Sequence, residues 1–352
     1  MTSVALPRPL LSVDALDRFL EAADDSPLPP AIDAEKKVLR TRRKQEVAYY
    51  VSAPRPPATR GEGARDHVRP PRPLLLVHSV NAAASAYEMR PLFERYRGDR
   101  TVVAMDLPGY GASERDRRTY TPELFADAIL DVAERVASKG VAPDVVALSL
   151  GCEFTALAAL ARPDAFASLT FLSPTGFSAK ENAVQAAGRS SRSDMVFRIL
   201  DTPVLSPLLY RALTSRPSLR HYLRKSFVGP VDEGLLAHAR ATSARPGARF
   251  APFHFLAGKL FTPDVADRVY AALDVPTHVV FDEDAYVTFD RLSEIERANP
   301  KITSTRILPS RGLVHFELPD ATARTLEAFW ARTHARTPHR RASERGAHAR
   351  AN

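Results

Sequence analysis

Residues 145–154 read Val-Val-Ala-Leu-Ser-Leu-Gly-Cys-Glu-Phe, and this stretch decides the fold. A short apolar run ends at Ser149, small residues stand two positions to either side of it, and an alanine-rich helical segment follows. A serine in a strained turn from strand to helix needs small neighbours, because larger side chains would collide with the adjacent strand and helix. The pattern therefore predicts that Ser149 is a nucleophile with a helix N-terminus behind it. The alternative is an ordinary serine that caps the helix.

The same rhythm of apolar run, polar residue and helix repeats along the chain. It predicts parallel strands that are buried on both faces, and ligands of such sheets bind beyond the carboxyl ends of the strands. The predicted strands are 74–77, 101–105, 145–148, 168–172, 278–281 and 303–308, and the predicted helices are 121–139, 152–161 and 320–332. Residues 37–52 predict two strands of a hairpin, and 12–23 predict a short amphipathic helix.

One block departs from this rhythm and helps to define the domain organisation. Residues 176–274 contain helical segments punctuated by prolines and no convincing strand, so we expect a helical cap over the ligand-binding end of the sheet. The expected divisions are 1–53 for the N-terminal helix and first strands, 54–73 for a flexible Pro/Arg loop, 74–175 and 275–333 for the two parts of the α/β core, 176–274 for the cap, and 334–352 for a disordered basic tail.

Charge and composition restrict the function classes. The formal net charge is +8, but segments 54–73 and 334–352 carry +3 and +4 of it, so the body of the chain is nearly neutral. We therefore expect solvated basic segments rather than a nucleic-acid site, with weak contact to an acidic surface as the alternative. The single cysteine excludes an internal disulfide, and no apolar run approaches the ~18 residues of a membrane span. Residues 1–25 do not resemble a secretory signal, so we expect a cytoplasmic protein; nothing indicates its oligomeric state.

Two further motifs lie in the expected order before Ser149. Residues 74–85 (LLLVHSVNAAAS) are a strand followed by His78 and a run of small residues, and residues 106–113 read DLPGYGAS. A dinucleotide site is excluded there, because position 114 is Glu rather than a third Gly. Together with the serine turn, these motifs resemble the α/β-hydrolase superfamily. The resemblance implies a mostly parallel central sheet flanked by helices, with a helical cap insertion.

The resemblance also implies a set of site residues. Ser149 would be the nucleophile, Asp284 the acid and His315 the base, in the chain order that the family uses. Asp282 is the alternative acid, and Glu283 and Asp290 are further candidates. The oxyanion hole would be formed by the backbone N–H groups of Leu150 and Val80, with Ser79 as the alternative to Val80. Three departures from the family pattern stand out: Ala147 and Ser79 each stand where a Gly is usual, and Leu313-Val314 separates Gly312 from His315.

The remaining candidates have a structural alternative each. Phe253 and Phe255 would line an apolar acyl pocket or pack the cap against the core. Cys152 is expected to be a small buried helix residue. No residue cluster has metal-ligand spacing, and we expect no cofactor.

The sequence therefore predicts a serine hydrolase that cleaves a carboxylic ester, thioester or lactone of a small, apolar molecule through an acyl-enzyme on Ser149. Two alternatives keep the same fold. The triad could serve C–C bond hydrolysis or cofactor-free peroxidation, or the chain could be a non-catalytic binder.

Overall fold

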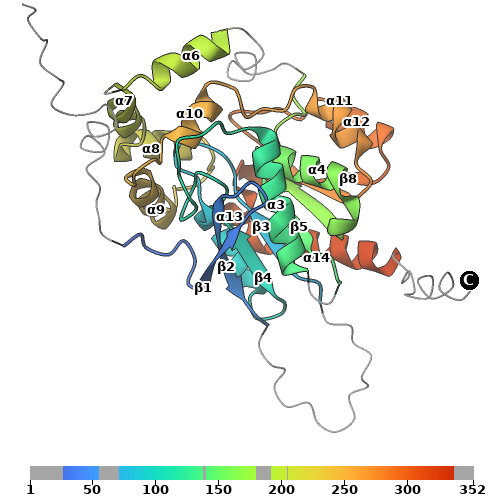
Figure 1. Ribbon diagram of the computed structural model, residues 1–352. Coiled ribbons are helices and arrows are strands. Elements are labelled where there is room, and N and C mark those ends of the chain that lie inside the picture. Colours follow the sequence, from blue (N-terminus) through green and yellow to red (C-terminus); the bar gives the residue numbers. More distant parts are fainter. Residues whose placement is uncertain (1–26, 55–70, 138–139, 180–191, 204, 337–352) are drawn as a thin grey trace, which may run out of the picture.

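The computed structural model describes residues 27–54, 71–137, 140–179, 192–203 and 205–336. Its centre is an eight-stranded sheet with the order β1-β2-β4-β3-β5-β6-β7-β8 (Figure 1). The strands β3 to β8 run parallel, whereas β1 and β2 form an antiparallel hairpin at one edge. The strands are β1 Glu35–Arg40, β2 Glu46–Ser52, β3 Leu74–Val77, β4 Val102–Met105, β5 Asp144–Leu148, β6 Ser168–Leu172, β7 Thr277–Glu283 and β8 Ile302–Arg311.

The central strands β3 to β6 are short, mostly apolar segments, and a polar residue follows the last residue of each. All residues of β3, β4, β5 and β6 are buried, which a parallel sheet covered on both faces requires. The register places Leu75 beside Val103 on one side and Val145 on the other. The predicted strands and hairpin are confirmed, and the carboxyl ends of β3 and β5 therefore lie next to each other.

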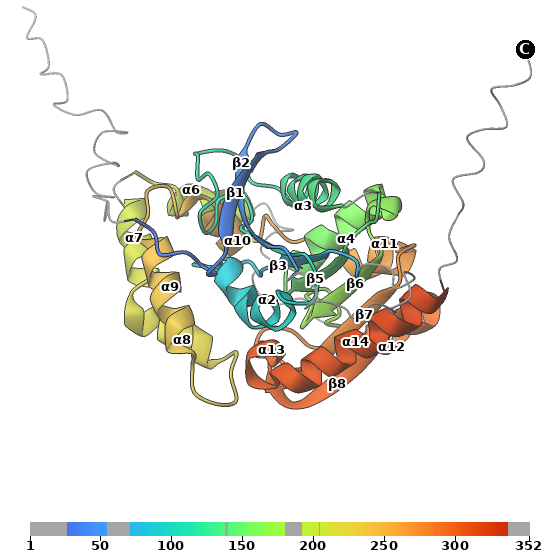
Figure 2. The same cartoon turned by 90° about the horizontal axis from the view of Figure 1, so that it is seen from below.

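Helices cover both faces of the sheet (Figure 2). One face carries α3 Pro122–Val136 and α4 Gly151–Ala161, and the other carries α2 Arg90–Tyr96 and α14 Pro319–Arg336. Thr121 begins α3 by accepting a 3.3 Å hydrogen bond from the N–H of Leu124, and Pro122 suits the first helical position. Smaller helices are η1 Ala86–Met89, η2 Pro163–Ala165, α12 Leu292–Ala298 and α13 Val314–Glu317.

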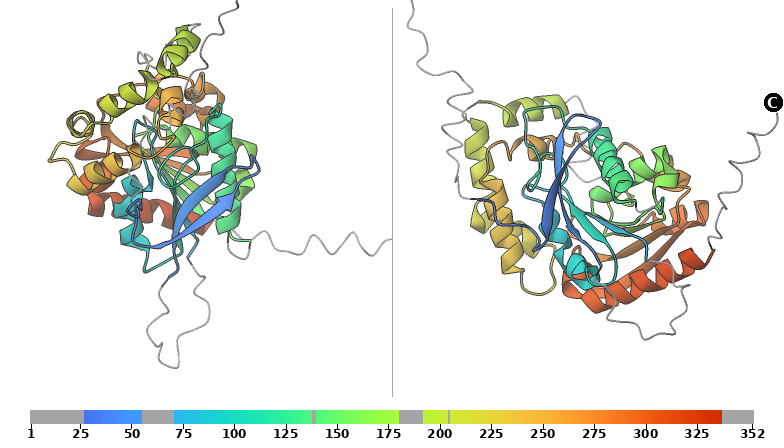
Figure 3. Two further views of the ribbon diagram at one scale, coloured as in Figure 1. Left: turned by 60° about the vertical axis from the view of Figure 1, so that its left-hand side comes forward. Right: turned by 60° about the horizontal axis from the view of Figure 1, so that its bottom comes forward.

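The helical insertion lies between β6 and β7. Its elements are α6 Arg192–Leu200, α7 Leu205–Leu213, α8 Arg216–Arg224, α9 Glu233–Ser243, α10 Phe250–Leu256, α11 Val265–Arg268 and η3 Tyr270–Ala272, and its described residues include no strand. The helices α6 to α9 lie together on one side of the sheet, and further views show the same grouping (Figure 3). Tyr210 of α7 donates a 2.7 Å hydrogen bond to the carbonyl of Ala82, so the insertion contacts the loop after β3.

Several predicted segments lie wholly or partly outside the described residues. They are the helix 12–23, the loop 54–73 at residues 55–70, the helix 121–139 at residues 138–139, the cap 176–274 at residues 180–191 and 204, and the tail 334–352 after residue 336. Residues 334–336 of the predicted tail belong to α14, and His334 lies 3.0 Å from a carboxylate oxygen of Asp144. Within the described part of the chain, no helix combines the length and apolarity that a membrane span requires.

Candidate active site

Ser149 occupies the strained turn that the sequence predicts. Its φ of 52° lies in the left-handed region, which non-glycine residues adopt only where the surroundings enforce it. Its N–H donates a 2.9 Å hydrogen bond to the carbonyl of Leu172, which ties the turn to β6. The side chain remains half-exposed at the N-terminus of α4. Ser149 is thus presented at the carboxyl edge of the sheet with the positive end of a helix behind it.

The small residues around Ser149 have separate reasons to be small. Ala147 is completely buried, so a larger residue there would meet its packed neighbours. At Gly151, an added Cβ would lie 2.4 Å from the carbonyl oxygen of His78, so only glycine fits without a backbone shift. Cys152 is also buried, with its sulfur 3.3 Å from the carbonyl of Ala147, and burial raises the pKa of its thiol. Cys152 is therefore the packing residue that the sequence predicts.

The loop after β3 brings its backbone N–H groups beside the serine turn. His78 is buried and holds this loop: its Nδ1 lies 2.5 Å from the carbonyl of Ser79, and its Nε2 accepts a 2.9 Å hydrogen bond from the N–H of Leu107. Burial lowers the pKa of His78 to about 4, so the ring is neutral at pH 7. Among the described residues, none accepts a hydrogen bond from the N–H of Val80 or of Leu150. Both groups are therefore unpaired within the described structure, which the predicted oxyanion role requires.

Glu88 is a buried residue of this region that the sequence analysis missed. Its carboxylate accepts hydrogen bonds from the N–H of Ser79 at 2.9 Å and from the side-chain amide of Asn81 at 2.8 Å. Burial raises the pKa of this carboxyl group, and the two donors oppose that rise. The only sequence signal was its place three residues after Ser85, the spacing of a helix-capping pair. The carboxylate engages the N–H of Ser79, so that group is not available to a substrate.

A second carboxylate, Asp106, shapes the segment that reads DLPGYGAS. Its two oxygens accept hydrogen bonds from the N–H groups of Ala86 at 2.7 Å and Ala112 at 2.9 Å. Gly111 has a φ of 53°, and an added Cβ would overlap the Asp106 carboxylate, so this position requires glycine. Burial raises the pKa of Asp106 to about 6. Asp106 thus joins the β4 loop to the start of η1, next to Glu88.

The two candidate acids at the end of β7 have different surroundings. Asp282 is buried and fully engaged, since it accepts hydrogen bonds from the Nε of Arg306 at 2.7 Å and the N–H of Ser310 at 2.8 Å. Asp284 accepts a 2.7 Å hydrogen bond from the N–H of Tyr286 through one oxygen, and burial raises its pKa to about 6. The N–H of Val287 is a further hydrogen-bond donor to Asp284, so its donors lie in the turn that follows it, whereas Asp282 fastens β7 to β8. Glu283 and Asp290 are exposed.

His315 makes no hydrogen bond with either of the partners that the sequence analysis expects for it. It is fully buried in α13, and its Nε2 lies 2.6 Å from the backbone carbonyl of Glu88. Its Nδ1 has no hydrogen-bond partner among the described residues, so neither nitrogen bonds to Ser149 or Asp284. Burial lowers the pKa of His315 to about 4. The role of His315 as the base stays a prediction, and this hydrogen bond argues against it.

The two phenylalanines proposed for the acyl pocket differ in environment. Phe253 is buried within the insertion, in a cluster with Tyr210 and Ala248, and its ring meets that of Tyr210 edge-on at 5.8 Å. Phe255 is half-buried, packs against the core and lies 5.7 Å from the ring of Phe261. The surroundings of Phe253 match the packing alternative, whereas Phe255 keeps some exposed surface.

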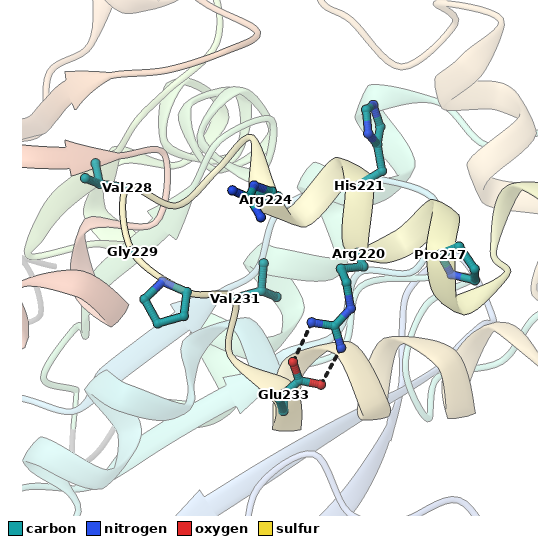
Figure 4. A pocket seen from close by; sticks show the side chains of 9 residues that line it. Pro217, Arg220, His221, Arg224, Val228, Gly229, Val231 and Glu233 are labelled. Atoms are coloured by element: carbon teal, nitrogen blue, oxygen red, sulfur yellow. Dashed lines mark hydrogen bonds and ion pairs between the residues drawn. The ribbon is translucent and has the colours of Figure 1, made fainter.

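A surface groove of about 650 Å³ lies between α8 and the segment before α9 (Figure 4). Arg220 and Glu233 form a double hydrogen bond across it, at 2.6 and 2.7 Å. None of the expected site residues lines this groove; its lining residues are Pro217, Arg220, His221, Arg224, Val228, Gly229, Pro230, Val231 and Glu233. Two of them, Val228 and Gly229, donate backbone hydrogen bonds to Glu317, so the groove adjoins α13, the helix that carries His315.

Comparisons with known proteins agree with this architecture. Solved structures with the same fold include a putative lipase from Acinetobacter baumannii AYE, with a TM-score of 0.64, 15% identity, and coverage of 95% of this chain and 100% of the other. Another is the enol-lactonase from Burkholderia xenovorans LB400, with a TM-score of 0.60, 15% identity, and coverage of 84% and 100%. At these identities the likeness concerns the fold alone.

The sequence comparisons point the same way. An uncharacterized hydrolase, YugF, from Bacillus subtilis (strain 168) is 27% identical over 113 residues, which are 32% of this chain and 41% of the relative. The match thus spans less than half the length of that relative. The model of the alpha/beta hydrolase family matches residues 74–325, which include strands β3 to β8, the insertion and every candidate site residue. With the serine turn between β5 and α4 and the parallel sheet that supports it, this chain belongs to the alpha/beta hydrolase family.

Proposed function

We propose that this protein is a serine hydrolase that cleaves a carboxylic ester, thioester or lactone through an acyl-enzyme on Ser149. The observation that carries the proposal is the geometry of Ser149, held at a φ of 52° between β5 and α4 and half-exposed. A folded protein keeps such backbone strain where the position of one side chain matters. The esterases, lipases and lactonases among proteins of similar fold support this reaction class.

In the proposed reaction, Oγ of Ser149 adds to the carbonyl carbon and loses its proton to a base. The bond to the alcohol or thiol then breaks, and the leaving group takes the proton. The N–H groups of Leu150 and Val80 would bind the oxyanion, since neither has a hydrogen-bond partner in the described structure. Water adds to the acyl group in the second half of the reaction and restores the serine.

The helical insertion would act as the cap that selects the substrate. The hydrogen bond from Tyr210 to the carbonyl of Ala82 joins α7 to the loop after β3. A shift of the insertion would therefore also move this loop. Phe255, which is half-buried beside Phe261, is the remaining aromatic candidate for contact with an apolar acyl chain. A small, apolar molecule is therefore the proposed substrate class.

A second candidate function is supported by the position of His315. Its imidazole is hydrogen-bonded to the carbonyl of Glu88 and not to Ser149 or Asp284, so the expected triad is not assembled in the described part of the chain. A protein with this arrangement would bind acyl compounds without turning them over.

A fluorophosphonate probe separates the two candidates, because it reacts with an activated serine. Labelling of wild-type protein that disappears in Ser149→Ala supports the hydrolase. If folded wild-type protein is not labelled while a known serine esterase is labelled beside it, the binder remains.

A further inference from the structure

Gly312 adjoins Oδ2 of Asp284, whereas His315 makes no hydrogen bond with this carboxylate. Gly312 follows β8 directly, and its N–H donates a 3.0 Å hydrogen bond to the carbonyl of Glu283, the residue before Asp284. A Cβ atom added to Gly312 would lie 3.1 Å from Oδ2 of Asp284. Any side chain at this position would therefore start next to the carboxylate. Glycine leaves the carboxylate without such a neighbour.

His315 has the wrong hydrogen-bonding state for a base at Ser149. A carbonyl oxygen only accepts, so the 2.6 Å contact with Glu88 requires that Nε2 carries the proton. A neutral ring then has its lone pair on Nδ1, and this atom is buried without a partner among the described residues. Nε2 cannot accept a proton from Ser149 in this state, and Nδ1 cannot donate one to Asp284.

The helix that carries His315 is also firmly held. The carboxylate of Glu317 accepts three backbone hydrogen bonds: from Arg311 at 2.8 Å, from Val228 at 2.6 Å and from Gly229 at 3.1 Å. These bonds fasten α13 to both β8 and the segment that follows α8. A displacement of α13 would break several of them, so they hold the helix, and with it the hydrogen bond from His315 to Glu88, in the observed position.

We infer that position 312 is the place of the general base in this site, and that the glycine there leaves Ser149 and Asp284 without a histidine between them. The inference rests on the proposed function only in taking Ser149 as the nucleophile and Asp284 as the acid. It assigns His315 a structural role, in which the ring joins α13 to η1. The wild-type chain is then a poor catalyst of ester hydrolysis that one substitution would improve.

The test is the variant Gly312→His, assayed with p-nitrophenyl acetate. Gly312 has a φ of 60°, in the left-handed region where histidine and asparagine occur more often than most other residues. The Cβ of Ser226 would lie 3.4 Å from the new Cβ, so the double variant Gly312→His/Ser226→Gly provides the same change with more room. Gly312→Asn is the matched control, because it has a similar backbone requirement but no base.

A positioned general base contributes about 10²–10⁴-fold to a rate. We expect kcat/KM to rise at least about 100-fold in one of the two histidine variants and not in Gly312→Asn. The gain should be lost in a Ser149→Ala background, should shrink at least tenfold in an Asp284→Asn background, and should follow the titration of an imidazole with pH. Thermal unfolding of each variant verifies that it is folded.

Two results would overturn the inference, and they differ in what they say of the proposed function. Wild-type activity that depends on Ser149 and falls more than about 100-fold in His315→Gln would make His315 the base and support the hydrolase. Folded histidine variants that neither hydrolyse the ester nor label with a fluorophosphonate would exclude both the base position and Ser149 as nucleophile. Gain of labelling in Gly312→His over an unlabelled wild type supports the inference and the binder.

Discussion

The backbone N–H of Ser79 donates a 2.9 Å hydrogen bond to the carboxylate of Glu88, nine residues further along the chain. This bond closes the loop after β3 and occupies one of the two N–H groups that the sequence leaves open for an oxyanion. The other candidate, the N–H of Val80, keeps no partner among the described residues. A buried carboxylate thus both shapes the loop and leaves one donor for the substrate.

Replacing Glu88 by Gln should therefore loosen this loop. The side-chain NH₂ group of the glutamine must face a donor, which is either the amide of Asn81 or the N–H of Ser79. One of the two hydrogen bonds is therefore lost inside a buried site. A buried group left without its partner costs about 1–3 kcal/mol. We expect a lower melting temperature and a slower reaction of Ser149 with a fluorophosphonate.

The matched control is Glu94→Gln in α2, where the carboxylate pairs with Arg97 at the surface. Surface pairs of this kind contribute about 0–1 kcal/mol, so the melting temperature should change little. Equal losses in the two variants would contradict a special role for Glu88.

Gly151 offers a second test of the serine turn. An added Cβ would lie 2.4 Å from the carbonyl oxygen of His78, so Gly151→Ala must push the oxyanion loop away from α4. Strain of this size in a packed region typically costs about 1–3 kcal/mol. We expect lower stability and at least a tenfold slower labelling of Ser149.

Gly98→Ala is the control for this substitution, because nothing lies within 4 Å of its added Cβ and its backbone is not left-handed. Its melting temperature and labelling rate should match those of the wild type. A harmless Gly151→Ala would show that the loop after β3 moves freely.

The sequence predicts the strands and the serine turn well because both depend on local patterns. Each central strand is an apolar run that ends at a polar residue, so its limits are visible in the chain itself. The hydrogen-bond partners of His315 could not be predicted from the sequence. They depend on the turn after β8 and on Glu317, whose carboxylate holds α13 by accepting hydrogen bonds from the N–H groups of residues 228 and 229. Glu88 was missed for a similar reason, since its partners lie seven and nine residues before it in an irregular loop.

Phe253 should behave as a packing residue of the insertion. Its side chain is buried against Tyr210 and Ala248, and truncation of a buried phenylalanine to alanine typically costs about 3–5 kcal/mol. We expect Phe253→Ala to lower the melting temperature without altering the preferred acyl chain length in a series of nitrophenyl esters. The ester series is measured in the Gly312→His background, where we expect a higher rate of ester hydrolysis than in the wild type.

Phe255→Ala provides the contrast, because Phe255 is only half-buried where it packs against the core. We expect a smaller loss of stability and a change in chain-length preference. A change in the preferred acyl chain length for Phe253→Ala instead would show that Phe253 lines the acyl pocket.

Glu153 predicts a dependence of stability on pH. It is buried in α4 and accepts hydrogen bonds from the side chain of Thr175 and, at 2.8 Å, from the N–H of Thr262, which lie before and after the main helices of the insertion. Burial raises the pKa of Glu153 from 4.5 to about 7. The folded protein therefore binds this proton more tightly than the unfolded chain does, and stability falls as the pH rises from about 4.5 to about 7.

Glu153→Gln removes this titration and keeps one acceptor and one donor for the two threonines. The melting temperature of the variant should fall less than that of the wild type between pH 4.5 and 7, so the difference between them should grow with pH across this window. Parallel curves for the two proteins would mean that the pKa of Glu153 is not raised.

Substitution of Asp282 and substitution of Asp284 should differ in their effects on both stability and activity. Asp282 accepts hydrogen bonds from Arg306 and the N–H of Ser310, so Asp282→Asn places an amide N–H against one of these donors and should lower the melting temperature. Asp284 has a pKa raised to about 6 by burial, so its ionised form opposes folding above that pH. Asp284→Asn should therefore leave the melting temperature at pH 8 unchanged or higher.

Activity gives the sharper distinction for the same pair. Neutralising an acid that orients a catalytic histidine costs about 10⁴ in kcat in a serine protease. Because Asp284 faces Gly312 in this chain, we expect Asp284→Asn to change the wild-type rate less than tenfold, and to remove most of the rate gained by Gly312→His. Asp282→Asn should not remove that gain in any folded sample. A large effect of Asp284→Asn on the wild type would mean that the carboxylate already acts on a histidine, and the assignment of His315 as its partner would have to be restored.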